Sequence, residues 1–96
     1  MRHWVLAAYD IGNEKRWRKI HTLMHDYGQP VQYSVFVCQL TPTDEVKLLA
    51  KAREIIHPEE DQLILVRLQP VGRSLNNRIR SVGRPLTSLD IKKLQF

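Results

Sequence analysis

The chain has 96 residues, enough for one domain with a modest hydrophobic core. Apolar residues make up 43% of it, an ordinary share for a globular protein that argues against disorder. No apolar run approaches the roughly 18 residues that span a bilayer, and the N-terminal apolar stretch is too short for a signal-peptide core. We therefore expect a cytoplasmic protein. Its single cysteine, Cys38, has no partner for an internal disulfide, and we interpret it as a buried, inert thiol.

Positive charge is concentrated in the last third of the chain. Residues 1–66 carry a net charge of −1 and residues 67–96 carry +6, which accounts for the overall +5 at pH 7. The cations between positions 67 and 84 are all arginines, which favour bidentate contacts with phosphate or carboxylate groups. We interpret this region as a polyanion-binding surface rather than a solvated basic tail. Its candidate nucleic-acid contacts are Arg78, Arg80 and Arg84.

The first half of the chain predicts a strand followed by a helix. Residues 5–9 are all apolar, which is typical of a strand buried on both faces, and Asp10 ends it. Asn13 is a suitable N-cap for a helix that extends to about residue 27, and Gly28 is expected to stop it. The apolar face of this helix comprises Trp17, Ile20, Leu23, Met24 and Tyr27.

His21 and His25 lie one turn apart on the first predicted helix. Such a pair can bind zinc, but a protein zinc site needs at least one more ligand, and no obvious residue supplies it. We therefore interpret both as ordinary histidines of the helix surface.

Residues 31–40 form the next apolar segment, which is either one kinked strand or a very tight hairpin. Thr41, Pro42 and Asp44 then predict the start of a second helix with a capping box. Residues 62–68 predict another strand, and residues 78–80 are a candidate edge strand. The face expected to cover the core in the second helix comprises Val46, Leu49, Ala50, Arg53 and Ile56.

Glu59, Glu60 and Asp61 make an acidic turn before the strand at residues 62–68. Three adjacent acids suggest a metal site, but neighbouring side chains in a turn point apart. We therefore favour a solvated connection.

The order strand, helix, strand, helix, strand predicts an α+β fold in which two helices cover one face of a small sheet. The strands are apolar on both sides, so the other face also needs cover. A second copy stacked across a two-fold axis supplies it most simply, and the alternative is the tail folding back over its own sheet.

Asp10 is the only carboxylate that a strand clearly positions. Mg²⁺ is typically held by one or two carboxylates together with water and substrate phosphates. Two copies of Asp10 across a two-fold axis would make a reasonable site, in which the metal activates water against a phosphodiester. In the alternative interpretation Asp10 is a turn former or helix cap. Nearby, Lys15, Arg16 and Lys19 are candidate phosphate contacts at the helix N-terminus, or simply a solvated helix face.

Three short motifs follow one another along the chain. They are YDI at 9–11 with YG at 27–28, VQYSVF at 31–36 followed by LTP at 40–42, and PEED at 58–61. Together they resemble the Cas-two family of small CRISPR-associated spacer-acquisition proteins. The similarity extends over residues 1 to about 70, and the motifs are specific in combination.

The resemblance implies a ferredoxin-like βαββαβ domain at residues 1–70, a basic extension at 71–96 that adds a strand or tail, and a face-to-face homodimer. It favours the tight hairpin within residues 31–40. It implies Asp10 as the catalytic residue and Mg²⁺ ligand of a nuclease acting on RNA or DNA. Tyr9, Ser34 and Phe36 would lie near the cleft of the dimer, with a buried strand position as the alternative for Phe36.

Three functional hypotheses follow. The first is a DNA-binding scaffold that bridges CRISPR-associated integrase subunits (the Cas-one protein) on double-stranded DNA. The second is an Mg²⁺-dependent endonuclease on RNA or DNA, with single-stranded RNA as one substrate. The third is a ferredoxin-like RNA-binding or regulatory module, which would need exposed stacking aromatics. We rank it last because Trp4, Tyr9, Tyr33 and Phe36 are expected in the core or an interface.

Overall fold

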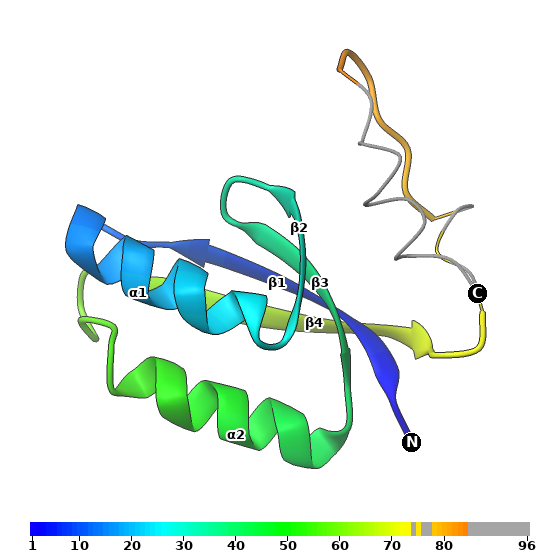
Figure 1. The fold of residues 1–96 in the computed structure, drawn as a ribbon, viewed down its shortest axis with the longest axis horizontal. Helices are drawn as coiled ribbons and strands as arrows, with labels where there is room; N and C mark the ends of the chain where they lie inside the picture. Colours follow the sequence, from blue (N-terminus) through cyan, green and yellow to red (C-terminus); the bar gives the residue numbers. More distant parts are fainter. Residues whose placement is uncertain (74, 76–77, 85–96) are drawn as a thin grey trace.

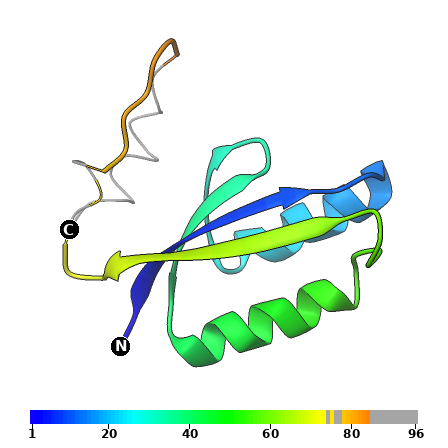
Figure 2. The same cartoon turned by 180° about the vertical axis from the view of Figure 1, so that it is seen from behind.

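The computed structural model describes residues 1–73, 75 and 78–84. Four antiparallel strands form one sheet in the order β2-β3-β1-β4, and both helices cover the same face of it (Figures 1 and 2). This arrangement confirms the predicted α+β, ferredoxin-like βαββαβ fold. The elements are β1 His3–Asp10, α1 Glu14–His25, β2 Gly28–Gln32, β3 Val35–Leu40, α2 Pro42–Arg53 and β4 Gln62–Pro70.

Both helices begin where their capping residues predict. The Asn13 side chain accepts a hydrogen bond from the Arg16 backbone N–H at 2.9 Å. Thr41 and Asp44 form the complete capping box that begins α2. The end of α1 differs from the prediction, because Gly28 starts β2. A Cβ there would collide with the carbonyl oxygen of Val37, so the close approach of β2 and β3 requires glycine.

Residues 28–40 form the tight hairpin rather than one kinked strand. Strands β2 and β3 pair antiparallel, and Tyr33 and Ser34 make the turn between them. The Ser34 carbonyl oxygen accepts a hydrogen bond from the Tyr9 backbone N–H at 3.0 Å, which ties the turn to β1.

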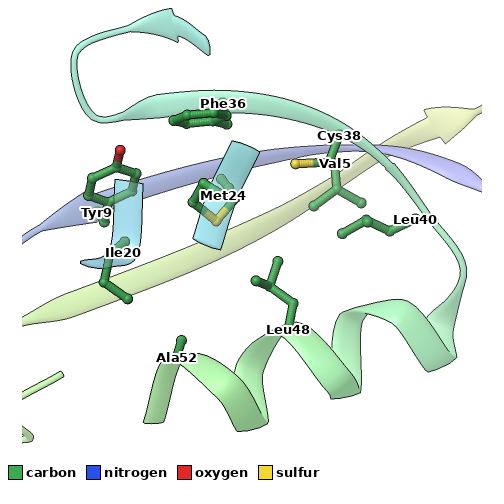
Figure 3. Packing of buried hydrophobic residues seen from close by; sticks show 10 residues of the cluster. Val5, Tyr9, Ile20, Met24, Phe36, Cys38, Leu40, Leu48 and Ala52 are labelled. Carbon is green, nitrogen blue, oxygen red and sulfur yellow. The ribbon is translucent and has the colours of Figure 1, made fainter. Parts of the chain in front are cut away.

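The main hydrophobic core lies between the sheet and the two helices (Figure 3). The predicted face of α1 is confirmed. The predicted face of α2 is wrong for most of its residues, although Ile56, just beyond the helix, packs against the core as predicted. Leu48 and Ala52 enter the core, whereas Val46 is 67% exposed and Ala50 and Arg53 are also exposed. Several leucine and alanine positions of α2 permit two apolar stripes, and packing against the sheet selects one of them.

The opposite face of the sheet, which we call the open face, is also apolar. Side chains alternate along a strand, so Leu6, Ala8 and Asp10 lie opposite the core residues of β1. The register places Ile64 beside Ala8 and Val66 beside Leu6 on this face. Figure 2 looks onto this side, with strands β1 and β4 in front of α1.

The chain covers one part of the open face itself. Leu75 is buried against Trp4 and Val37, and the Trp4 indole N–H donates to the Arg73 carbonyl at 3.0 Å. Residues 71–73, 75 and 78–84 contain no strand, so the predicted edge strand at 78–80 is wrong; residues 85–96 lie outside the described part. Three side chains of β4 stay 40–44% exposed beyond this cover: Ile64, Val66 and Leu68.

Candidate functional site

Asp10 occupies the end of β1 on the open face. It is exposed, and its register partner across the sheet is Gln62 of β4. The described residues contain no group of three histidine, cysteine, aspartate or glutamate side chains suited to a metal ion. A single chain therefore supplies one carboxylate, which suits Mg²⁺ only if a second copy, water and phosphate complete the site. Its position on the face that still needs cover is compatible with that arrangement.

The loop that follows Asp10 is held by Asp61. The Asp61 carboxylate accepts hydrogen bonds from the Gly12 backbone N–H at 2.8 Å and the Arg16 Nε at 2.6 Å. It also accepts the His57 backbone N–H at 2.8 Å, and its side chain is 0% exposed. We call these contacts the Asp61 clamp. The expectation of a solvated acidic turn was therefore wrong for Asp61, because the fold brings three donors to one carboxylate.

Within the Asp61 clamp, the carboxylate is stabilised as an anion. The hydrogen bond from Arg16, followed by those from the His57 and Gly12 backbones, holds the pKa of Asp61 well below its usual range. A depressed folded-state pKa adds stability that is complete above the unfolded pKa, near 4, and declines as the pH falls below it.

We expect Asp61→Asn to lower the free energy of unfolding by about 2 kcal/mol at pH 7, because the charge-assisted bonds are weakened. The difference from the wild type should shrink as the pH falls from 5 to 3. Urea unfolding of both proteins at equal protein concentration measures the free energy of unfolding at each pH. Glu59→Gln, an exposed change in the same turn, is the control. An Asp61→Asn difference that stays constant across this pH range would contradict the role of the carboxylate charge.

The predicted cations of α1 fall into two groups. Lys15 and Lys19 are exposed, as phosphate contacts require. The guanidinium of Arg16 instead pairs with Asp61 and with Glu60 at 3.3 Å. Its predicted phosphate contact stays a prediction, and the structure assigns Arg16 a second role in holding the loop after Asp10. Sequence reasoning missed this pair because 45 residues separate its members.

The arginines after β4 are presented to solvent. Arg78, Arg80 and Arg84 are all exposed, while Ile79 between the first two packs against the buried Trp4–Leu75 cluster. The three arginine side chains are therefore accessible to a polyanion from solvent. Arg67 is different, because it pairs with Glu45 of α2 at 2.7 Å.

The predicted cleft residues lie on the helix side of the sheet. Tyr9 and Phe36 are 6% and 0% exposed and belong to the main core, opposite the face of Asp10. The structure thus supports the buried alternative for Phe36. Ser34 accepts a hydrogen bond from the Trp17 indole at 2.9 Å. Tyr33 was expected in the core or an interface. It does not lie in the core, because it is 74% exposed and stacks on Trp17 with centroids 4.2 Å apart.

Comparison with known proteins decides the family. The profile of the family described as "CRISPR associated protein Cas2" matches residues 1–73. The chain belongs to the Cas2 family. Among curated Cas2 proteins, the CRISPR-associated endoribonuclease Cas2 of Geobacter sulfurreducens is 33% identical over 84 residues, covering 88% of this chain and 87% of that protein. The CRISPR-associated endoribonuclease Cas2 3 of Synechocystis is 38% identical over 86 residues, covering 90% and 79%.

Solved structures agree with the Cas2 assignment. The crystal structure of Streptococcus pyogenes Cas2 matches with a TM-score of 0.72 and 34% identity, covering 83% of this chain and 99% of that one. The crystal structure of a hypothetical protein from Thermus thermophilus matches with a TM-score of 0.71 and 29% identity, covering 91% of this chain and 100% of that one. The unrelated RNA-binding module, our third hypothesis, finds no support in these matches. Among the described residues, no helix of this Cas2-family chain is long and apolar enough to cross a membrane.

Proposed function

We propose that this chain acts in CRISPR spacer acquisition as a homodimeric scaffold that binds double-stranded DNA and bridges integrase subunits. The single observation that carries the proposal is the open face, where an apolar strip of a Cas2-family sheet ends at the exposed carboxylate of Asp10. The arginine-rich segment after β4 supports the choice of a polyanion as partner.

The apolar strip that the described residues leave uncovered supports the dimer. Ile64, Val66 and Leu68 are 40–44% exposed and lie on β4, beside the part of the face that Leu75 covers. Strand residues of this kind gain stability when a second apolar face excludes water from them. A two-fold stack of open faces would also bring two Asp10 carboxylates to the same side of the interface.

The DNA contact is assigned to Arg78, Arg80 and Arg84. We expect replacement of all three by glutamine to reduce the slope of log K against log salt by about one for each lost phosphate contact. Fluorescence anisotropy with a labelled duplex at several salt concentrations measures this slope. The matched control replaces three cations of α2 with glutamine: Lys47, Lys51 and Arg53. A slope unchanged by the first replacement, or reduced equally by the control, would contradict the assignment.

An Mg²⁺-dependent endoribonuclease is the second candidate. It is favoured by the endoribonuclease names of the relatives and by the position of Asp10 at the end of β1. When bound, Mg²⁺ would lower the pKa of a coordinated water that attacks the phosphodiester. Asp10 would hold the ion, and the Asp61 clamp would keep the following loop in place.

A spacer-integration assay with the integrase partner separates the two candidates. Under the scaffold proposal, Asp10→Asn retains integration at near wild-type efficiency, because DNA binding and partner bridging do not need the carboxylate. Abolished integration by an Asp10→Asn variant that still dimerises and binds DNA would overturn the scaffold proposal in favour of a catalytic role.

A further inference from the structure

Two histidines of α1 face each other on the helix side of the sheet. His21 and His25 are four residues apart, which places them on one helix face. Their Nε2 atoms are 3.3 Å apart. Since the Asp10 carboxylate lies on the open face, this pair is a separate feature of the molecule.

The separation of the two nitrogen atoms matches a shared metal ion. A zinc–histidine bond is about 2.0–2.1 Å long, so two nitrogen ligands in tetrahedral positions lie about 3.3 Å apart. The same distance is long for a hydrogen bond donated by nitrogen, because the donor–acceptor distance in such bonds is commonest near 2.9–3.0 Å. The two rings are therefore already at the spacing of a chelate.

Both rings are held in position by contacts that do not depend on a metal. His21 stacks on Trp17 with centroids 4.4 Å apart and an interplanar angle of 16°. Its Nδ1 lies 2.8 Å from the Tyr9 hydroxyl. The His25 ring meets Phe36 edge-on at 5.1 Å. Little side-chain entropy remains to be lost when the pair binds an ion.

Tyr9 supplies the outer contact that metal-bound histidines usually have. In most such sites the ring nitrogen that does not bind the metal is hydrogen-bonded, which fixes the tautomer and the ring orientation. The Tyr9 hydroxyl pairs with Nδ1 of His21 whichever of the two groups donates, and metal binding selects the tautomer in which Nδ1–H donates and the lone pair of Nε2 faces His25. This tautomer leaves Nε2 ready to bind a cation.

We propose that His21 and His25 form a two-histidine chelate for a borderline transition-metal cation, Zn²⁺ or Cu²⁺. The described residues contain no third histidine, cysteine or carboxylate ligand at this place. The pair therefore has fewer protein ligands than the usual zinc site, and water completes the coordination. Imidazole ligands suit these cations, whereas Mg²⁺ prefers oxygen ligands. Binding joins two successive turns at the C-terminal end of α1 and so stabilises the folded chain.

Isothermal titration of the untagged, full-length protein with Zn²⁺, Cu²⁺ and Mg²⁺ tests this chelate. We expect saturable binding of one Zn²⁺ or Cu²⁺ per chain, with Cu²⁺ tighter, and no binding of Mg²⁺ at this pair. His25→Ala should weaken binding at least tenfold, whereas His57→Ala, a histidine in the turn after α2, should not. Cys38 is buried, and burial raises the pKa of its thiol to about 12, so it does not compete.

Nitrogen NMR of the wild-type histidine rings makes the test independent of any variant. Selective shifts of the Nε2 signals of His21 and His25 on addition of Zn²⁺ would support the chelate. Three results would overturn the chelate: Zn²⁺ and Cu²⁺ binding that does not saturate below about 1 mM, metal binding weakened equally by His25→Ala and His57→Ala, or NMR shifts confined to other histidines. Each of them would mean that His21 and His25 form a hydrogen bond only.

Discussion

Asp10→Asn is expected to reduce Mg²⁺-dependent cleavage of RNA or DNA at least about 100-fold, with little change in DNA binding. A metal ion contributes several kcal/mol of transition-state stabilisation, and each 1.36 kcal/mol lost costs a factor of ten in rate. Asparagine keeps the size of the side chain but removes the charge that attracts the cation. Asp10 is exposed and lies at the end of its strand, so the substitution should leave the fold intact.

The cleavage measurement needs a control that removes a comparable charge elsewhere. Asp26 is an exposed carboxylate at the C-cap of α1, and Asp26→Asn should cleave at the wild-type rate. Single-turnover rates on labelled single-stranded RNA and duplex DNA, at saturating Mg²⁺, give the comparison. Cleavage by pure Asp10→Asn at the wild-type rate would show that the activity comes from another site or a contaminant.

Val66→Glu is expected to convert the proposed homodimer into a monomer. Val66 is 42% exposed in the single chain, so a carboxylate there remains hydrated as long as the chain is alone. In a stack of open faces the same carboxylate loses its water and faces an apolar surface, which costs several kcal/mol. We therefore expect the dissociation constant of the dimer to rise at least about 100-fold.

Analytical ultracentrifugation over a range of protein concentrations measures the change in dimer stability. Val46→Glu is the matched control, because Val46 is 67% exposed on α2, away from the sheet. Circular dichroism of both variants checks that they fold. A folded Val66→Glu protein that remains as dimeric as the wild type would show that β4 does not form the interface.

The Val66→Glu variant also connects the prediction about cleavage by Asp10 with the prediction about the dimer. If Mg²⁺ is held by paired Asp10 side chains, a monomeric Val66→Glu protein loses cleavage although its own Asp10 is unchanged. A monomer that still cleaves at the wild-type rate would mean that one carboxylate per chain is enough.

The sequence alone determined both helix starts and the α+β class, whereas the choice between one strand and a hairpin within residues 31–40 needed the structure. These features depend on local chemistry: the side chain of Asn13 and the capping box of Thr41 and Asp44 satisfy backbone N–H groups within a few residues. The continuous apolar character of β1 likewise predicted a sheet that needs cover on both faces. The motifs carrying the family resemblance are local as well, and the family match confirmed it.

Only the tertiary structure decided which side chains meet. It selected Leu48 and Ala52 for the core face of α2, and it placed Asp10 and Phe36 on opposite faces of the sheet. It also joined Arg16 to Asp61, which gives Arg16 a role as a loop anchor that the sequence did not predict. Contacts between residues 45 positions apart depend on how the sheet brings loops together, and no periodic pattern in the sequence records that distance.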